Sequence, residues 1–307
     1  MSLPGLLSIT VFMLLSGFQF QPQPTLRVNV DEVLLHVAVT DSSNSYISNL
    51  TKNDFQIWED KIEQNVEYFT TANAPLSVGI ILDVSDSMKF GLGSARSAAE
   101  TFLTAGDPKN EYFLIQFSDT PRLTQDFTSD VKKVQKSLAM TKAKGNTSLY
   151  DAVYLGLETL NRGSNARKAL LVITDGGDNN SRYPLSAVKE FAEEHDAMIY
   201  TVGIGVANRP EWHLPGRSPK ARLKSLAEMT GGKAYFPDSA RDLTDICALI
   251  STDLKSQYVL GYRSLNLSRD GRWRKVRVTV DRRTQGSGHV RTRSGYYASA
   301  IGKSSKP

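Results

Sequence analysis

The stretch LSVGIILDVSDS, residues 76–87, joins an apolar run of strand length to a short polar sequence rich in oxygen-bearing side chains. The run LSVGIILD (76–83) is almost continuously apolar, which is typical of a strand buried on both faces of a parallel sheet. In the sequence DVSDS, Asp83, Ser85 and Ser87 stand at alternate positions. We therefore expect a polar site at the end of a buried strand.

Further apolar runs follow and alternate with segments of helical periodicity. Buried strands are predicted at 111–118, 168–175, 197–205 and 233–236, with an edge strand at 121–128. Helices are predicted at roughly 92–105, 130–140, 148–162, 184–195, 219–230 and 240–256, the third starting at Ser148 and Asp151 in an arrangement that resembles a capping box. The alternation predicts an α/β fold over 76–256, with a doubly wound, mostly parallel, Rossmann-like sheet.

Strand-like segments flank this region on both sides. Before it come residues 28–40, FQIWED (55–60) and VEYF (66–69), within an N-terminal β segment over 25–74. After it, QYVLGYRS (257–264) and DGRWRKVRVTV (270–280) belong to a C-terminal β segment over 257–298, with a turn expected at Asp270 and Gly271. We expect the two segments to pack together as a small β-sandwich-like domain that carries the α/β domain as an insertion, and residues 299–307 to be a disordered tail.

The start of the sequence, LPGLLSITVFMLLSGF (3–18), is an apolar run shorter than a comfortable membrane span. It predicts a secretory signal peptide within residues 1–22, and hence a secreted, periplasmic or extracellular protein. Because no Lys or Arg precedes Arg27, an uncleaved N-terminal anchor that attaches the chain to a membrane is the alternative.

The formal net charge of the chain is +5, and its basic residues crowd into the last fifth of the sequence. They alternate there with apolar residues in the manner of a strand, and no base-stacking aromatic series accompanies them, so we expect a solvated strand face and no nucleic-acid binding. Cys247, the single cysteine, lies on an apolar stripe and is expected to be a core residue.

Two further oxygen-bearing side chains stand at comparable places in the chain: Thr147, before a predicted helix, and Asp175, at the end of a predicted strand. Carboxylate and hydroxyl oxygens suit Mg²⁺ or Mn²⁺. Taken singly, Asp83 fits a helix cap, Thr147 a loop hydroxyl and Asp175 a turn residue. Taken together at strand ends, the five residues predict a metal site, at the crevice where the strand order of an open sheet reverses.

These motifs, D-x-S-x-S, a later threonine and T-D-G, resemble the metal-ion-dependent adhesion site of the von Willebrand factor type A (VWA) family. The resemblance covers about 76–256. It implies that Asp83, Ser85, Ser87, Thr147 and Asp175 bind Mg²⁺, with Mn²⁺ or Ca²⁺ as alternatives, and that an Asp or Glu of a partner protein completes the site, as in cell adhesion or assembly. The outer segments NLTKNDFQIWED, SQYVLGYRS and RSGYY resemble VWFA-related secreted proteins of acidobacteria.

Four other residues are candidates for a partner-binding rim around this site, namely Ser118, Asp119, Asp178 and Asn179. Turn and loop roles are their alternatives. No nucleophile elbow and no phosphate-binding loop occurs, so we expect a binding protein and no enzyme. A Mg²⁺-dependent hydrolase and an intracellular assembly or chaperone-like subunit are the alternatives. The helix at 240–256 carries an apolar stripe that should pack on the sheet, formed by Leu243, Ile246, Leu249, Ile250 and Leu254.

Overall fold

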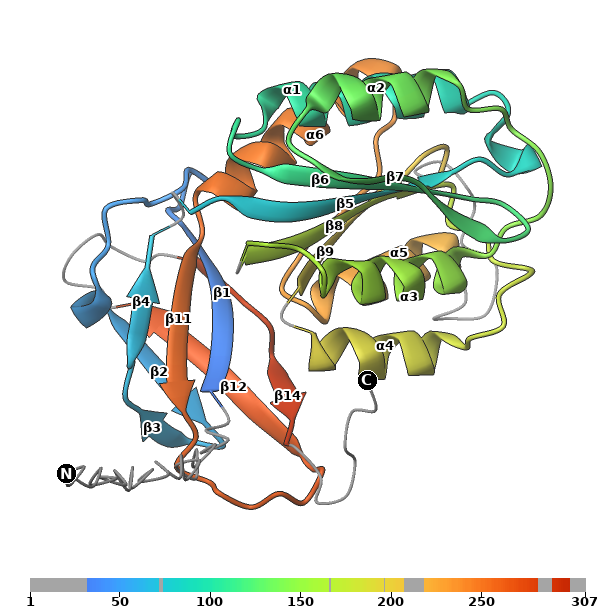
Figure 1. Ribbon diagram of the computed structural model, residues 1–307. Helices are drawn as coiled ribbons and strands as arrows, with labels where there is room; N and C mark the ends of the chain where they lie inside the picture. The colour runs from blue at the N-terminus through green and yellow to red at the C-terminus, as the bar shows by residue number, and fades with distance from the viewer. Residues whose placement is uncertain are drawn as a thin grey trace, which may run out of the picture. The chain divides into compact units, whose positions relative to one another are not determined.

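A six-stranded sheet with the strand order β10-β9-β8-β5-β6-β7 forms the centre of the computed structural model (Figure 1). All neighbouring strands are parallel except β6 and β7. The strands are β5 (Leu76–Asp83), β6 (Glu111–Phe117), β7 (Pro121–Thr128), β8 (Arg167–Thr174), β9 (Ala197–Gly203) and β10 (Ala234–Tyr235). The expected doubly wound sheet with an edge strand at 121–128 is confirmed. The order reverses at β5, which lies between β8 and β6.

The structure describes residues 32–71, 74–165, 167–195, 197–206, 218–280 and 289–298. The predicted signal or anchor segment (1–22) and the predicted disordered tail (299–307) lie outside these ranges. Within the described residues, no helix combines the length and the apolar character that crossing a membrane requires.

Helices cover both faces of the central sheet. They are α1 (Leu92–Ala105), α2 (Val131–Ala139), α3 (Leu149–Leu160), α4 (Leu185–Glu194), α5 (Pro219–Glu228) and α6 (Ala240–Lys255). Residues of α1, α2 and α6 share one buried apolar cluster with the sheet, and residues of α3, α4 and α5 share another, so the two groups lie on opposite faces (Figure 1). Burial on both faces explains why strands such as LSVGIILD carry almost no polar residues.

The flanking segments form a separate set of two antiparallel sheets, called here the β module, residues 32–70 and 258–298. The sheet orders are β13-β1-β11-β4 and β14-β12-β2-β3. The strands are β1 (Glu32–Thr40), β2 (Phe55–Glu59), β3 (Ile62–Gln64), β4 (Tyr68–Thr70), β11 (Tyr258–Arg263), β12 (Trp273–Val280), β13 (His289–Arg291) and β14 (Gly295–Tyr297). Both sheets contribute to one apolar cluster that includes Leu35, Ile57 and Leu260. N- and C-terminal strands thus build one β structure, as expected.

Three local expectations were wrong. Ser148 makes no capping hydrogen bond, because its hydroxyl donates to the carbonyl oxygen of Ser118 at 2.7 Å. Asp270 and Gly271 do not join a hairpin, since β11 and β12 belong to different sheets. Leu249 is 41% exposed, whereas the other members of its stripe on α6 are buried or partly buried.

A buried ion pair connects the α/β part to the β module. Asp253 on α6 pairs with Arg291 on β13, and its side chain is 0% exposed. The hydroxyl of Tyr200 on β9 donates to Asp253 Oδ2 at 2.8 Å and accepts from Gln257 Nε2 at 2.7 Å. Arg291 also donates to the carbonyl oxygen of Gly231. The end of α6 is therefore fixed both to the sheet and to the β module.

Candidate metal-binding site

The carboxyl ends of β5 and β8 bring the first candidate ligands together. Asp83 is the last residue of β5, and Leu82 pairs with Ile173 on the adjacent strand, which places Thr174 and Asp175 beside Asp83. Asp83 is 0% exposed and Asp175 is 4% exposed. Two carboxyl groups therefore lie buried at the point where the strand order reverses.

Neutral donors hold the Asp83 carboxylate in place. The backbone N–H of Ser85 donates to Oδ1 at 2.9 Å, and the hydroxyl of Thr174 donates to Oδ2 at 2.6 Å. Within the described part of the chain, no Lys or Arg forms an ion pair with Asp83. Burial raises the pKa of Asp83, the hydrogen bonds from Ser85 and Thr174 lower it, and the charge of Asp175 raises it further. The site is thus electrostatically suited to a cation.

The two serines that are candidate ligands share one short turn. The hydroxyl oxygens of Ser85 and Ser87 lie 3.0 Å apart, and Ser87 is exposed whereas Ser85 is buried. The turn is the 3-10 helix η2 (Asp86–Met88), and the N–H of Asp86 donates to the carbonyl oxygen of Gly145 at 2.9 Å. This hydrogen bond ties the serine turn to the loop that carries Thr147.

Thr147 and Asp175 both lie close to Gly177. A Cβ atom added to Gly177 would lie 3.1 Å from Asp175 Oδ1 and 3.9 Å from Thr147 Oγ1. The absence of a side chain at Gly177 therefore leaves space beside both oxygens. The N–H of Gly177 donates to Asp175 Oδ1 at 2.9 Å, which fixes the carboxylate.

The four predicted rim residues hold the loops around Thr147. The Asn179 side chain accepts from the Thr147 N–H at 2.9 Å, and Asp119 Oδ1 accepts from the backbone and side-chain nitrogens of Asn146. The Ser118 carbonyl oxygen accepts from the Ser148 N–H and hydroxyl, and Asp178 accepts from the Ser181 hydroxyl. These contacts position the loops, and contact of the four residues with a partner stays a prediction.

Sequence reasoning missed three residues of this arrangement. Thr174 supplies a hydrogen bond to Asp83, although its place directly before Asp175 in the T-D-G motif marks it as a neighbour of the site. Asp151 accepts from the backbone nitrogens of Arg182 and Tyr183 and anchors the loop after Asp175 to α3. Gly145 has φ +91°, and a Cβ there would lie 2.4 Å from Asp119 Oδ2, so another residue would displace the loop.

The donor set is of mixed type. Among the described residues, no group of three or more His, Cys, Asp or Glu side chains is placed to hold a metal ion. The predicted set has two carboxylates and three hydroxyls, and such oxygen donors suit hard cations that retain water molecules. The residues therefore fit a magnesium-type ion better than zinc, which is bound mainly by Cys and His.

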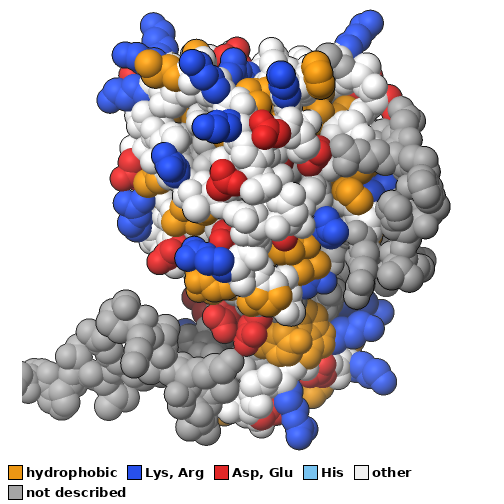
Figure 2. Space-filling model, turned by 90° about the vertical axis from the view of Figure 1, so that its right-hand side faces the viewer, with side chains coloured by type: hydrophobic (Ala, Val, Ile, Leu, Met, Phe, Trp, Pro, Cys, Tyr) orange, Lys and Arg blue, Asp and Glu red, His pale blue; other side chains and the backbone are white. Residues whose placement is uncertain are grey.

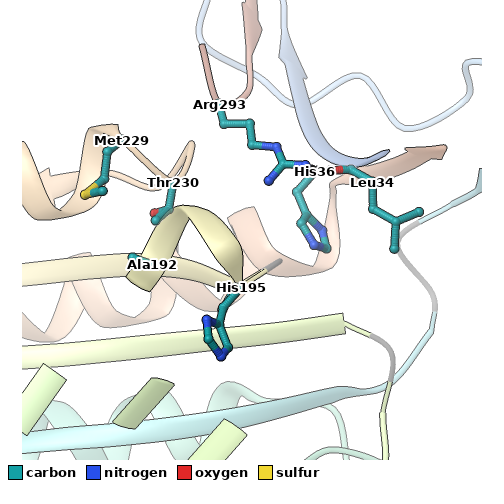
Figure 3. Close-up of a pocket in the computed structure, with 8 residues that line it drawn as sticks. Leu34, His36, Ala192, His195, Met229, Thr230 and Arg293 are labelled. Carbon is teal, nitrogen blue, oxygen red and sulfur yellow. Dashed lines mark hydrogen bonds between the residues drawn. The ribbon is translucent and has the colours of Figure 1, made fainter. Parts of the chain in front are cut away.

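A pocket lies near the amino-terminal end of β9, away from the candidate metal site. This small pocket between the β module and the α/β part is lined by Leu34, His36, Ala192, His195, Ala197, Met229, Thr230 and Arg293 (Figure 3). Its residue Ala197 begins β9, whereas Asp83 and Asp175 lie at strand ends. Both ring nitrogens of His195 are within hydrogen-bond distance of α/β groups, Asn161 Nδ2 and the Phe191 carbonyl oxygen. This histidine is therefore a structural residue of the α/β part.

Comparisons with known proteins agree with this architecture. Residues 78–177 match the family model described as von Willebrand factor type A domain. No curated protein matches the chain. Among solved structures, a von Willebrand factor type A protein from Catenulispora acidiphila is similar, with a TM-score of 0.53, 12% identity, and coverage of 80% of this chain and 73% of that one.

Two further structures are similar at lower scores. The protein BatB from Bacteroides thetaiotaomicron has a TM-score of 0.48 and 18% identity, with coverage of 58% of this chain and 98% of that one. The pilus adhesin SpaC from Lactobacillus rhamnosus GG has a TM-score of 0.49 and 13% identity, with coverage of 87% and 52%. The matched residues 78–177 lie within the doubly wound sheet and include all five candidate ligands. At residues 78–177 the chain therefore matches the von Willebrand factor type A domain.

Proposed function

We propose that this protein binds a partner protein through a divalent cation, Mg²⁺ in the first place, with Mn²⁺ or Ca²⁺ as alternatives. The cation is held by Asp83, Ser85, Ser87, Thr147 and Asp175. The observation that carries the proposal is the pair of buried carboxylates Asp83 and Asp175, and the donors to Asp83 are the neutral N–H of Ser85 and the neutral hydroxyl of Thr174. VWA domains often bind divalent metals and generally bind protein ligands, which supports this assignment.

The preference of hard cations for anionic oxygen explains the choice of partner. Two carboxylates among five protein ligands offset the charge of a divalent cation only when both are ionised, and three neutral hydroxyls add none. A cation in such a site gains from a further carboxylate, because anionic oxygen is the ligand that hard cations prefer. The chain's own residues would fix the cation, and an Asp or Glu of the partner would complete its coordination.

The setting of this activity is part of the proposal. The apolar run 3–18 supports an exported protein, secreted, periplasmic or extracellular, in which the VWA domain is the recognition unit. An intracellular assembly subunit with the same domain is the alternative. No enzymatic role is proposed, and the Mg²⁺-dependent hydrolase stays an untested alternative.

The metal is tested with Mn²⁺ as the probe, by electron paramagnetic resonance of the free ion during titration. Wild type is expected to bind one Mn²⁺ that Mg²⁺ displaces, and Asp83→Asn is expected to lose it. Asp86→Asn is the matched control, because Asp86 is exposed in the same turn and is no proposed ligand. Equal Mn²⁺ binding by wild type and Asp83→Asn contradicts the assignment.

The partner carboxylate is tested with two peptide libraries that differ at one position, Asp or Glu in one and Asn or Gln in the other. The immobilised chain is expected to retain acidic peptides in Mg²⁺ and to release them in EDTA. Thr147→Ala should reduce retention while Asp86→Asn should not. Retention that is equal for both libraries, or that survives EDTA, places recognition elsewhere.

A further inference from the structure

The loop between β11 and β12, residues 264–272, exposes large apolar side chains to solvent. Leu267 is 87% exposed and Leu265 is 66% exposed. Ile62 on the edge strand β3 is 55% exposed, and the neighbouring Gln64 accepts from the Leu265 N–H at 3.0 Å, so the same end of the β module carries a third apolar side chain. We call Ile62, Leu265 and Leu267 the apolar tip. Exposed apolar residues that cluster commonly mark an interaction surface.

Buried polar groups hold this loop in its conformation. The hydroxyl of Ser264 donates to Glu59, a buried carboxylate that also accepts from Tyr262 at 2.7 Å. The guanidinium of Arg274 donates to the carbonyl oxygen of Ser268 at 3.1 Å and pairs with Asp270 at 2.9 Å. The leucines are therefore presented by a loop that the module fixes at both ends.

Cationic and aromatic side chains surround the apolar tip. Residues 263–275 contain five basic residues and one acidic residue, Asp270, which pairs with Arg274 and Arg272. Arg263 pairs with Glu67, Arg274 is buried, and the exposed Asp60 and Glu63 lie near Ile62 in the sequence, so Arg269, Arg272 and Lys275 are the basic residues that the loop offers to an anionic surface. Trp273, at the loop's exit, contacts Tyr297 edge to face at a centroid distance of 5.0 Å, and both rings are partly exposed. Figure 2 shows Lys and Arg side chains beside hydrophobic ones at the height of the β module. Apolar, basic and Trp or Tyr side chains together suit the interface of an anionic bilayer.

With the N-terminal segment uncleaved, the course of the chain favours lipid over protein as the occupant. Glu32, the first residue of β1, pairs with Arg263, the last residue of β11, so the polypeptide enters the β module at the end where the loop begins. The segment before this entry contains the apolar run 3–18. The opposite end of β11, Tyr258, follows α6 and the α/β part (Figure 1). The apolar tip thus lies at the end of the module where the chain's most apolar segment is attached.

We propose that the apolar tip docks on the surface of an anionic phospholipid bilayer, with Leu265 and Leu267 inserted among the lipids and Arg269 and Arg272 near the phosphates. The proposal is independent of the metal site, which lies at the carboxyl ends of the central strands β5 and β8. It concerns docking of a loop on one leaflet and does not require a membrane-spanning helix.

The test places an environment-sensitive fluorophore on the tip of the full chain, so that loop insertion is measured separately from any binding by the N-terminal segment. Asn266→Cys is labelled between the two leucines, and Met140→Cys, 74% exposed after α2, is the control in the α/β part. Cys247 is buried, and wild type treated with the fluorophore shows how much label this cysteine takes up. Vesicles of phosphatidylcholine with or without phosphatidylglycerol, and their brominated forms, serve as the membrane.

We expect a blue shift and bromine quenching at position 266 with phosphatidylglycerol vesicles, and neither at position 140. Leu265→Ser with Leu267→Ser should reduce the inserted fraction roughly tenfold or more, because two apolar side chains no longer leave water. Arg269→Gln with Arg272→Gln should reduce insertion only into the anionic vesicles.

Several results would overturn the proposal. One is an aqueous spectrum at position 266 on vesicle-bound chains, which would mean that the N-terminal segment binds alone. Another is a blue shift without vesicles that grows with protein concentration, which would mean that a second copy covers the tip. Insertion that is unchanged in Leu265→Ser with Leu267→Ser would exclude the leucines. None of these results bears on Mn²⁺ binding, so the two proposals can fail separately.

Discussion

Two buried aspartates of this chain, Asp83 and Asp253, have opposite electrostatic surroundings. Both side chains are fully buried, yet Asp253 forms an ion pair with Arg291, whereas the donors to Asp83 are the neutral N–H and hydroxyl of Ser85 and Thr174. A buried charge is costly unless a partner compensates it. At the junction the chain supplies the compensating cation itself. At the end of β5 we propose that the cation comes from solution, and this difference separates a structural carboxylate from a binding one.

The largest effect in this comparison is expected from Arg291→Met. The substitution keeps the aliphatic part of the side chain but leaves Asp253 charged and buried without its cation. The free energy of unfolding should fall by about 3–5 kcal/mol, measured by urea denaturation. Adding Asp253→Asn to Arg291→Met should recover much of the loss. An uncompensated buried charge costs more than about 1 kcal/mol. If the free energy of unfolding of Arg291→Met alone stays within about 1 kcal/mol of wild type, Asp253 does not depend on Arg291.

At Asp83 the expected effect depends on the metal. In EDTA, Asp83→Asn should be as stable as wild type or more stable at neutral pH, because the variant removes a buried charge that Asp175 repels. With Mg²⁺ at a hundredfold excess over Kd, wild type should gain about 2.7 kcal/mol and the variant should gain nothing. Thermal denaturation with and without Mg²⁺ measures both, and Asp86→Asn should behave as wild type. A variant that loses stability in EDTA would make Asp83 a structural residue like Asp253.

A smaller effect is expected when Tyr200 loses its hydroxyl. Tyr200→Phe removes the donor to Asp253 Oδ2 and the acceptor for Gln257 Nε2 while the ring stays in the core. A loss of about 1–3 kcal/mol should follow, because hydrogen bonds to charged groups are worth more than neutral ones. Urea denaturation measures it. A loss equal to that of Arg291→Met would mean that the hydroxyl contributes as much to holding Asp253 as the guanidinium does.

The smallest effect is expected at an exposed ion pair. Asp126 pairs with Arg162 at 3.2 Å, and both side chains are more than half exposed. A backbone hydrogen bond from Phe127 and the Arg162 guanidinium lower the pKa of Asp126. Its contribution is therefore present at neutral pH and is lost as the pH falls through the lowered pKa. Arg162→Met should cost at most about 1 kcal/mol at pH 7 and less in acid, by urea denaturation at both pH values. A loss as large as that of Arg291→Met would refute burial as the deciding variable.

The central sheet could be predicted because burial on both faces leaves a strong signal in the sequence. The run LSVGIILD matches β5 residue for residue, and the polar edge segment 121–128 matches β7. The β module carried a weaker signal. Its strands β3 and β13 have three residues each, too few for a periodic pattern, and β13 pairs with β1 from the other end of the sequence.

The candidate site could be predicted where its residues lie at the ends of strands that the sequence itself indicates. Asp83 and Asp175 follow apolar runs that pair in the sheet, so their proximity follows from the strand order. The role of Ser148 was not predictable, because its hydroxyl is taken by the Ser118 carbonyl of another strand end. The pairing of Asp253 with Arg291 was also hidden, since nothing local to α6 indicates which distant arginine would face it.

The pairing of β4 with β11 brings the two ends of the α/β part close together. Thr70 and Val259 face each other on adjacent antiparallel strands, and the sequence between Thr70 and Tyr258 is the α/β part with its two connections. A two-residue turn is enough to join antiparallel neighbours. Residues 71–257 can therefore be excised and replaced by a short turn to give a continuous hairpin that keeps Tyr258 and its pairing with Val37. A different recognition domain, with its termini close together, could be grafted onto this β module between the same two strands.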